Sequence, residues 1–453
     1  MPKRCLDQRG IAVTLGEGGA CMESDVSDFQ KPGFSELVRT FGRIGCLSFG
    51  GPAGQIALMH EEIVVRREWV AEDDYLHALN FCHLLPGPEA QQLATWIGWR
   101  LHGVKGGIAA GGLFVLPGAL VMLALSMLYA MAADLGWFAA LFLGIKAAVL
   151  AIVLQALQRI AGRALKGRLA VAIAVAAFAA LFLLNAPFPL VVLCAGLVGY
   201  ASGPHVAPVP TAPQPSLVRH TVVTVVGWGV VWAVPPVIAL MLLGPDHVLT
   251  KIGLFFSQLA VVTFGGAYAV LSYMAQEAVQ QYHWLRPNEM VDGLGLAETT
   301  PGPLILVAQH VGFLAAYRAP APFSPLLAGA LGAAMTTWVT FAPCFLWIFA
   351  FAPWIERLRH AARLKSALAG VTAAVVGVIA NLTVWFALHV LFARTGMLHA
   401  GPLRLVVPEW TSIDWRAVAV ALLAGVLLLR LRWSVLRVLA VSAAAGLALA
   451  TAV

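Results

Sequence analysis

Charged residues are scarce in this chain. Asp, Glu, Lys and Arg make up 11% of its 453 residues, whereas apolar types make up 60%. A soluble globular domain carries about 25% charged residues, so this chain cannot cover a water-facing surface. The composition excludes a string of soluble domains and predicts an all-α protein that crosses a membrane many times.

Enzyme and metal-site motifs are missing as well. The six cysteines form no Cys-x-x-Cys pair, and most lie in apolar runs, which favours small buried side chains over disulfides or zinc ligands. The sequence contains no Gly-x-Ser-x-Gly, His-Glu-x-x-His or Walker motif. We therefore expect no catalytic residues, no cofactor and no metal. Basic cytoplasmic loops account for the net charge of +7, so we expect no nucleic-acid partner.

Long apolar runs are abundant. A spanning helix needs roughly 20 mostly apolar residues, and thirteen runs qualify as candidate transmembrane helices. They cover 34–58, 76–99, 106–132, 137–158, 169–184, 187–201, 220–243, 250–274, 290–315, 324–351, 366–392, 414–429 and 433–452.

The chain divides into two halves around a proline-rich stretch. We expect a cytoplasmic tail at 1–33, which lacks the apolar core of a signal peptide. A first repeat follows at 34–201, then a linker at 202–219, a connecting transmembrane helix at 220–243 and a second repeat at 249–453.

The two halves repeat each other. Three anchors of the first half return 215 residues later: Phe49-Gly50-Gly51 as Phe264-Gly265-Gly266, Trp69 as Trp284, and Pro86-Gly87-Pro88 as Pro301-Gly302-Pro303. Pro117 pairs with Pro343 and Gly144 with Gly370 at an offset of 226. The unpaired helix 220–243 makes the number of crossings between equivalent motifs odd. This predicts two repeats of inverted topology, as many secondary transporters have.

The basic residues predict the orientation. With a cytoplasmic N-terminus and thirteen crossings, 19 Lys and Arg residues fall in cytoplasmic segments and 7 in external ones. Basic residues resist translocation, so this distribution supports a multi-pass protein with its N-terminus in the cytoplasm.

The repeated motifs are helix breakers inside apolar runs. Irregular backbone at membrane depth is tolerated where it packs in protein or lines a wet cavity. Each break starts a half-helix whose free N–H groups and positive dipole end suit an anion. Packing kinks are the alternative. The predicted substrate-binding residues at the breaks are Ser48, Gly50, Gly51, Gly87, Gln91, Gln92, Thr263, Gly265, Gly266, Thr300 and Gly302.

Ionisable residues inside the spans extend this prediction. Arg43 and Lys146 could neutralise a dianion, Arg43 through a planar fork, although Lys146 could instead extend to the membrane surface. Glu298, Glu89 and Asp292 lie near the breaks and are candidate proton carriers. Capping of half-helix N-termini is the alternative for these carboxylates.

At these motifs the sequence resembles the chromate ion transporter family in its long, two-domain form. The likeness spans about 34–393 and rests on segments of both halves: 41–45, 48–52, 66–69, 85–94, 263–270 and 295–303. One departure is Gln55, where many members are expected to carry histidine.

The resemblance implies secondary-active export of chromate, a tetrahedral dianion, across the bacterial inner membrane, which confers chromate resistance. Protons or the membrane potential would drive the export. A sulfate or other oxyanion carrier of the same fold and an anion channel are the alternatives. The expected partners are the chromate or sulfate anion, the lipid bilayer and, as an option, a second copy of the chain in a homodimer.

Overall fold

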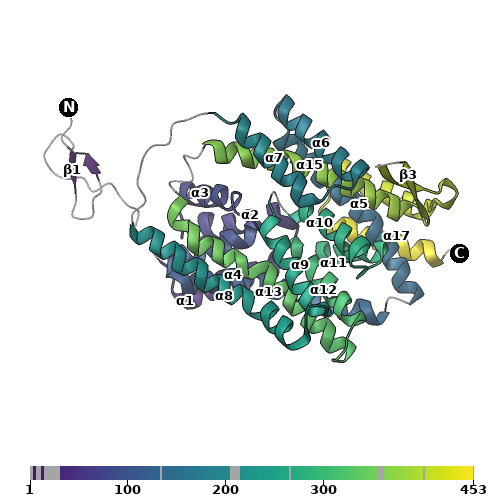
Figure 1. Cartoon of the computed structure of the whole chain (residues 1–453), viewed down its shortest axis with the longest axis horizontal. Helices are drawn as coiled ribbons and strands as arrows, with labels where there is room; N and C mark the ends of the chain where they lie inside the picture. Colours follow the sequence, from purple (N-terminus) through teal and green to yellow (C-terminus); the bar gives the residue numbers. More distant parts are fainter. Residues whose placement is uncertain are drawn as a thin grey trace.

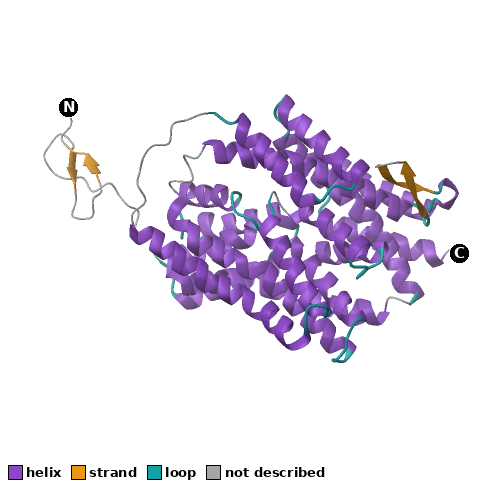
Figure 2. Cartoon of the chain, in the orientation of Figure 1, coloured by secondary structure: helices purple, strands orange, loops and turns teal. Residues whose placement is uncertain are grey.

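The computed structural model describes residues 4–6, 12–14, 31–132, 135–204, 215–264, 267–355, 362–400 and 403–451. Nearly all of this is helix, as Figure 2 shows. The strands form two antiparallel hairpins: β1 (Arg4–Leu6) with β2 (Ala12–Thr14), and β3 (Thr395–Ala400) with β4 (Leu403–Pro408). Within the described residues, five helices are long and apolar enough to cross a bilayer unaided. The expected class, an all-α multi-pass membrane protein, is confirmed.

The helices of the first half are α1 (Phe34–Leu47), α2 (Gly51–His60), η1 (Glu61–Val65), α3 (Glu72–Cys82), α4 (Glu89–Ala132), α5 (Gly136–Ala164), α6 (Arg168–Leu184) and α7 (Phe188–Ser202). The backbone of α4 is non-helical at His102 and Gly103. We therefore divide this helix into α4a, up to His102, and α4b, from Gly103 onwards.

The connecting helix is α8 (Pro215–Leu243). The second half holds α9 (Val248–Val262), α10 (Ala267–Gln276), η2 (Glu277–Gln281), α11 (Pro287–Thr299), η3 (Leu304–Leu306), α12 (Val307–Arg318), α13 (Pro325–Phe351), η4 (Ala352–Trp354), α15 (Ala362–Leu391), η5 (Trp410–Ser412), α16 (Trp415–Gly425), η6 (Val426–Arg430) and α17 (Val435–Thr451).

Four of the predicted spans are each a pair of short helices. The first is interrupted where α1 ends at Leu47 and α2 begins at Gly51. Gly50 and Gly51 have φ values of 85° and 72° at this break, a left-handed conformation that glycine adopts without steric cost. At 1.5 Å per residue, α1 is about 21 Å long, which is short of the roughly 30 Å hydrocarbon core. Neither short helix can cross the membrane alone.

The helices group into two bundles (Figure 1). In one, which we call the hairpin bundle, α4 packs against α1 and α13, and α13 packs against α8, α9 and α12. We count α10 and α11 with this bundle because they follow α9 and pack against α9 and α12, respectively; α10 also contacts α15, and α11 contacts α5. In the other, the scaffold bundle, α5 packs against α15, α16 and α17, while α15 packs against α6 and α7. Each bundle contains helices from both halves of the chain.

Two glycines show that the halves exchange helices inside the scaffold bundle. A Cβ atom at Gly144 of α5 would lie 1.9 Å from the carbonyl oxygen of Ser442 in α17. A Cβ atom at Gly370 of α15 would lie 2.4 Å from the carbonyl oxygen of Ala195 in α7. Since Gly144 and Gly370 are equivalent in the repeat, each half supplies a helix that packs closely on the other half's central helix. Such close contacts through small residues are typical of membrane bundles.

Paired tryptophans attach α8 to α13. Trp232 Nε1 donates a hydrogen bond to the carbonyl of Val339 at 3.1 Å, and Trp338 Nε1 donates to the carbonyl of Val231 at 3.1 Å. Pro343 has no backbone N–H to donate to the carbonyl of Val339, and a proline of α8 likewise leaves the carbonyl of Val231 without its helical donor. Each tryptophan thus satisfies a carbonyl that a proline exposes in the neighbouring helix. The opposite face of α8 carries apolar side chains such as Met241, which is 79% exposed and faces lipid in a membrane protein.

Candidate functional site

The four short helices of the first half begin or end at one end of the hairpin bundle. Three contacts join these helix ends: His60 to Glu72 (2.6 Å), Asp74 to Arg100 (3.7 Å) and His102 to the carbonyl of Pro32 (2.8 Å). The start of α1, the end of α2, the start of α3 and the end of α4a therefore lie together. We call this the His102 end. Both pairs of short helices leave this end, break and return to it, so each pair is a helical hairpin.

The second half forms the same arrangement at the opposite end of the bundle. Arg318, at the end of α12, donates hydrogen bonds to Glu289 of α11 (2.9 Å) and to the carbonyl of Trp284 (2.8 Å). His247, just before α9, contacts the carbonyl of Ala321 at 2.8 Å. We call this the Arg318 end. The long helix α4b runs between the two ends, because its last turns lie beside α11 through Tyr129 and Asp292.

The breaks of the two halves meet tip to tip. The backbone N–H of Gly87 donates to the carbonyl of Thr263 at 2.8 Å, and the N–H of Gly302 donates to the carbonyl of Ser48 at 2.8 Å. The two hydrogen bonds are equivalent, because Gly87 corresponds to Gly302 and Ser48 to Thr263 in the repeat. A two-fold axis between the halves would produce such a pair. We call residues 48–51, 84–88, 263–264 and 300–303 the hairpin junction. The predicted site residues Gly265 and Gly266 lie outside the described residues.

Glycine is needed at the two Pro-Gly-Pro breaks. Gly87 has a φ of 117° and Gly302 a φ of 92°, both in the region that residues with a Cβ atom avoid. Close packing adds to this requirement, since a Cβ atom at Gly87 would lie 2.9 Å from Cys344 Sγ. The second break is also closely packed, because a Cβ atom at Gly118 of α4b would lie 2.1 Å from the carbonyl oxygen of Pro301. By contrast, Cβ atoms at Gly50 and Gly51 would meet nothing within 4 Å. The first Phe-Gly-Gly break therefore borders open space.

The hydroxyl groups at the junction donate to backbone carbonyls in this structure, and their role in anion binding stays a prediction. Each donates its proton to a carbonyl one turn earlier: Ser48 to Ile44 (2.6 Å), Thr263 to Leu259 (2.5 Å) and Thr300 to Ala297 (2.9 Å). A hydroxyl has a single proton to donate. These side chains instead satisfy carbonyls at helix C-termini, where the dipole is negative. The N-termini of α2, α4, η3 and α10 remain the positive ends at the junction.

Glutamine amides brace the junction. Gln55 Nε2 donates to the carbonyl of Gly302 at 2.6 Å, and Gln92 Nε2 donates to the carbonyl of Pro86 at 2.6 Å. Gln91 Nε2 lies 3.5 Å from the carbonyl of Phe341. The Oε1 atoms of all three glutamines are buried without a hydrogen-bond partner among the described residues. Gln55 was absent from the predicted site, although its departure from the family pattern was a signal.

Titratable groups lie beside the breaks of both halves. Tyr268 donates to Glu298 Oε1 at 2.8 Å, and Glu298 is 4% exposed. In the first half, His83 Nδ1 lies 3.4 Å from Glu89 Oε1. Glu298 and His83 are equivalent in the repeat, so each half places an ionisable pair next to a Pro-Gly-Pro break. The sequence analysis singled out the carboxylates but missed Tyr268, whose position in the turn after Phe-Gly-Gly could have indicated it.

Lys146 and Asp292 pair with each other. The Nζ atom of Lys146 lies 3.2 Å from Asp292 Oδ1, and Tyr129 donates to Asp292 Oδ2 at 2.8 Å. Next to them, His310 is fully buried, its ring lies 5.1 Å from that of Tyr129, and its Nδ1 lies 3.0 Å from Ser126 Oγ. Lys146 was expected to neutralise a substrate. In this structure a carboxylate already compensates its charge, and the pair joins α5 of the scaffold bundle to α11 of the hairpin bundle.

Arg43 is exposed on α1, five residues before Ser48. No ion pair to it is found within the described part of the chain. The role of Arg43 in neutralising a dianion therefore stays a prediction, at an exposed position rather than in an ion pair. Its guanidinium carries no carboxylate partner in the described structure, in contrast to the ammonium of Lys146.

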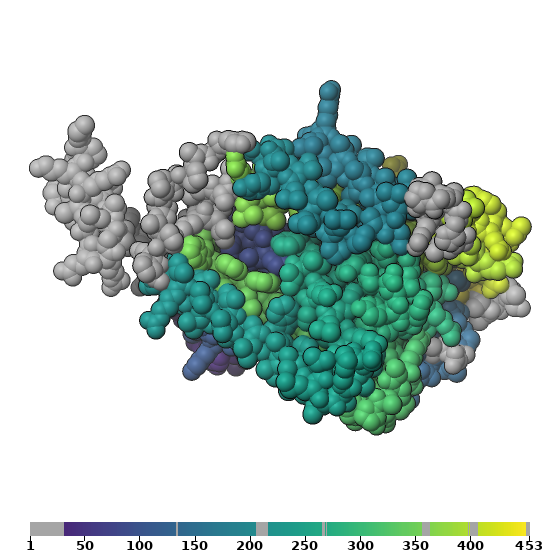
Figure 3. Space-filling model, in the orientation of Figure 1, coloured from purple at the N-terminus to yellow at the C-terminus, as the bar shows by residue number. Residues whose placement is uncertain are grey.

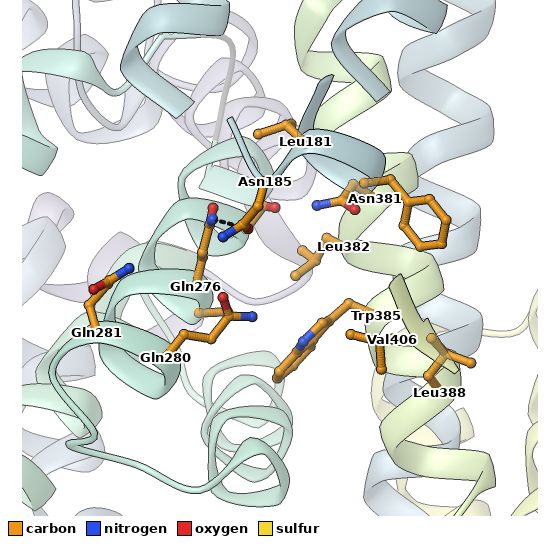
Figure 4. A pocket seen from close by; sticks show the side chains of 13 residues that line it. Leu181, Asn185, Gln276, Gln280, Gln281, Asn381, Leu382, Trp385, Leu388 and Val406 are labelled. Atoms are coloured by element: carbon orange, nitrogen blue, oxygen red, sulfur yellow. Dashed lines mark hydrogen bonds between the residues drawn. The ribbon is translucent and has the colours of Figure 1, made fainter. Parts of the chain in front are cut away.

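A cavity of about 240 Å³ lies between the two bundles (Figure 4). Amide side chains from both bundles face it: Asn185 and Asn381 from the scaffold, Gln276 and Gln280 from α10 and η2. Gln276 Nε2 donates to Asn185 Oδ1, a second contact between the bundles. The lining holds amides, Ser272 and apolar groups but no ionisable side chain. No cluster of three or more potential metal ligands occurs among the described residues.

These features define a class: an integral membrane protein whose broken helices meet at a central junction, as in secondary transporters. A family described as chromate transporter matches residues 35–200 and 250–447. The chain belongs to the chromate transporter family, and the resemblance seen in the motifs is confirmed.

Several curated relatives are similar to the chain over most of its length. It is 32% identical over 357 residues to a chromate transport protein of Pseudomonas aeruginosa, covering 78% of this chain and 80% of that protein. It is 28% identical over 351 residues to a chromate transport protein of Cupriavidus metallidurans, covering 77% and 81%. An uncharacterized transporter of Bacillus subtilis matches 92 residues at 33% identity, or 20% of this chain and 47% of that protein. No solved structure matches the chain.

Proposed function

We propose that this protein exports chromate from the bacterial cytoplasm through the hairpin junction by alternating access. The observation that carries the proposal is the reciprocal pair of hydrogen bonds from Gly87 to Thr263 and from Gly302 to Ser48. It brings four broken helices together at one place, where half-helix N-termini can hold an anion. Relatives named as chromate transport proteins support chromate as the first candidate substrate.

The membrane topology in this proposal has nine crossings and two pairs of hairpins. The crossings are α4b, α5, α6, α7, α8, α13, α15, α16 with η6, and α17. The first pair of hairpins enters from the cytoplasm and the second from outside, so the repeats are inverted. Replacing four full spans by hairpins moves Arg66 and Arg67 to the cytoplasm and Arg286 to the outside. The cytoplasmic segments then hold 20 Lys and Arg residues and the external segments hold 6. This is a stronger cytoplasmic bias than the 19 and 7 that thirteen crossings give.

The substrate would reach the junction from the His102 end. Gly50 and Gly51 border open space, so the N–H groups at the start of α2 are open to an anion. Arg43, exposed on the helix before them, would attract the dianion with its planar fork of donors. A recess between α7 and α13 exposes atoms of the first hairpins (Figure 3), and α13 ends beside the His102 end because Phe349 lies against Gly107.

Two contacts between the bundles would close the path at the Arg318 end. These are the Lys146–Asp292 ion pair and the Gln276–Asn185 hydrogen bond. When they open, the amide-lined cavity of Figure 4 would become the exit. Asp292 and Glu298, each 4% exposed, are the candidate proton carriers that could couple this opening to a proton gradient.

The energetics favour export. Moving one charge across 100 mV is worth about 2.3 kcal/mol, so a dianion gains about 4.6 kcal/mol when it leaves a negative interior. The membrane potential is therefore sufficient to drive efflux, and proton antiport would add to it.

Transport into everted membrane vesicles tests the function. Vesicles that carry the protein should accumulate labelled chromate. Uptake no greater than in vesicles from a strain without the protein would contradict the proposal. Excess sulfate that abolishes chromate uptake, together with faster uptake of sulfate itself, would identify a sulfate carrier of the same fold. Flux that does not saturate and shows no trans-stimulation would identify a channel.

A further inference from the structure

A groove of about 620 Å³ lies where the end of α5 meets the turn between η6 and α17. Its polar lining comes from Gln155, Gln158 and Arg159 of α5 and from Arg432 and Ser434 of the turn. Leu428, which is 1% exposed, is also among the lining residues. The groove thus combines polar donors with an apolar wall, and the transport proposal assigns it no role.

The two arginines of the groove lack anionic partners. No carboxylate lines the groove, and neither Arg159 nor Arg432 forms an ion pair within the described residues. Arg159 Nη2 has one long hydrogen bond, 3.4 Å to Gln155 Oε1. Each guanidinium presents five donors in a planar fork that matches a tetrahedral oxyanion. Two such groups around one groove favour the binding of an anionic ligand with several oxygen atoms.

The backbone fixes the position of Arg432. This residue has a φ of 54°, a left-handed conformation that is costly for a residue with a Cβ atom. Hydrogen bonds from the N–H of Leu431 to Val426 and from the N–H of Trp433 to Leu427, each 3.0 Å, hold the turn on both sides. The turn is therefore a defined structure that presents Arg432 opposite Arg159.

An apolar stripe continues from the groove along α16 and η6. Leu422 is 67% exposed, Val426 53% and Leu429 36%, on successive turns, and Trp433 beside the groove is 40% exposed. This stripe faces lipid in a membrane protein, so a phospholipid whose phosphate lies in the groove would place its acyl chains along it. Tryptophan is enriched at the level of lipid headgroups, and basic pockets between transmembrane helices bind anionic headgroups.

We infer that this groove binds the phosphate of an anionic phospholipid, with the acyl chains along Leu422, Val426 and Leu429. Arg159 and Arg432 hold the phosphate oxygens, and Gln158 and Ser434 add neutral donors. The ligand would link α5 to the junction of η6 and α17, and so stabilise the scaffold bundle against which the hairpin bundle moves.

Native mass spectrometry of the purified full-length protein tests this inference without any substrate. Phosphatidylglycerol is titrated against phosphatidylcholine with the same acyl chains. The double variant Arg159→Gln/Arg432→Gln should bind phosphatidylglycerol roughly 30-fold more weakly, because each arginine that lines the groove contributes roughly fivefold through its contact with the phosphate. The matched control Arg163→Gln/Arg430→Gln removes the same charge from α5 and η6 and should bind within twofold of wild type, because neither side chain lines the groove.

Two further arms decide the source of the phosphate. Wild-type protein should bind phosphatidylglycerol more tightly than inorganic phosphate, and Arg159→Lys/Arg432→Lys, which keeps the charge, should retain lipid binding. Equal lipid binding by the groove variant and its control would overturn the inference. Inorganic phosphate that binds as tightly as the lipid would overturn the assignment to phospholipid. Because lipid binding is measured in the absence of chromate, neither result depends on the proposed transport.

Discussion

A few residues hold the hairpin tips together. Gly87 and Gly302 supply left-handed backbone and donate to Thr263 and Ser48 of the opposite half. Gln55 adds a side-chain bond to the carbonyl of Gly302, and its Nε2 also lies 3.4 Å from the carbonyl of Ser48. One amide therefore reaches both halves of the junction.

Gln55 tests how strictly the junction depends on such bonds. Gln55→Leu removes the donor and leaves the carbonyl of Gly302 buried and unpaired, which costs about 1–3 kcal/mol. We expect chromate transport to fall about tenfold or more, measured in vesicles with equal amounts of inserted protein. Gln55→His keeps a ring N–H near the same carbonyl and should retain most of the transport. Equal loss in both variants would argue against a donor role for this position.

The Lys146–Asp292 pair gives a second residue-scale prediction. Lys146→Met leaves a buried carboxylate without its partner, which costs about 3–5 kcal/mol in comparable pairs. The double variant Lys146→Met/Asp292→Asn removes both charges and should recover most of the loss in thermal stability. Lys105→Met, at an exposed lysine without an ion pair in the described structure, is the control and should change stability by about 0.5 kcal/mol or less.

Transport measurements distinguish a Lys146–Asp292 pair that closes the path from a pair that only stabilises the structure. If the pair closes the path at the Arg318 end, the double variant should be stable but leak chromate without saturation. Normal, saturable transport in a stable double variant would show that the pair is structural and does not gate the path.

Residue patterns singled out the glycines and ionisable residues of this region but did not show which of them meet. Equivalent glycines such as Gly144 and Gly370 were visible as repeat anchors, and the structure explains them by the backbones of α17 and α7 against them. Lys146 and Asp292 are 146 positions apart in sequence, and nothing local to either shows that they meet. A single chain indicates which residues are costly to bury, but their partners depend on tertiary packing.

At the scale of elements, helix length decides what the breaks mean. The sequence located every break, since Phe-Gly-Gly and Pro-Gly-Pro stand in the middle of apolar runs. It did not reveal that the chain turns back at these breaks, because a kinked span and a hairpin have the same composition. Contacts between helix ends, such as His102 with Pro32 and Arg318 with Trp284, show that the chain turns back.

Accessibility of introduced cysteines distinguishes hairpins from full spans. Asp73 and Asn288 are equivalent in the repeat and exposed at the starts of α3 and α11. In a cysteine-free background, a membrane-impermeant maleimide applied to intact cells should label Asn288→Cys but not Asp73→Cys. Thirteen full crossings predict the opposite pattern.

Two further positions control for reagent access. Asp246→Cys should be labelled and Lys166→Cys protected in either topology, because the two arrangements agree on these loops. Labelling of Asp73→Cys from outside, with Lys166→Cys still protected, would contradict the hairpins.

At the scale of the whole molecule, the two bundles share helices from both halves. α7 of the first half packs on α15, and α17 of the second half packs on α5. This exchange could not be predicted from the sequence, because equivalent helices have similar apolar surfaces and either pairing would bury them. The exchange means that the scaffold bundle requires both halves, and motion between the bundles would change access to the junction from both sides.

The central claim is that an oxyanion crosses this protein at the hairpin junction. Its most direct test is chromate flux into proteoliposomes under an imposed membrane potential, positive on the receiving side. Wild-type protein and the helix-interior control Gly112→Ala, where a Cβ atom meets nothing within 4 Å, should show saturable flux that rises with the potential. Gly302→Ala, which forces a Cβ atom into left-handed backbone at the junction, should lose that flux while still inserting into the membrane. Flux through Gly302→Ala equal to that of the control, or wild-type flux no greater than in empty liposomes, would contradict the account.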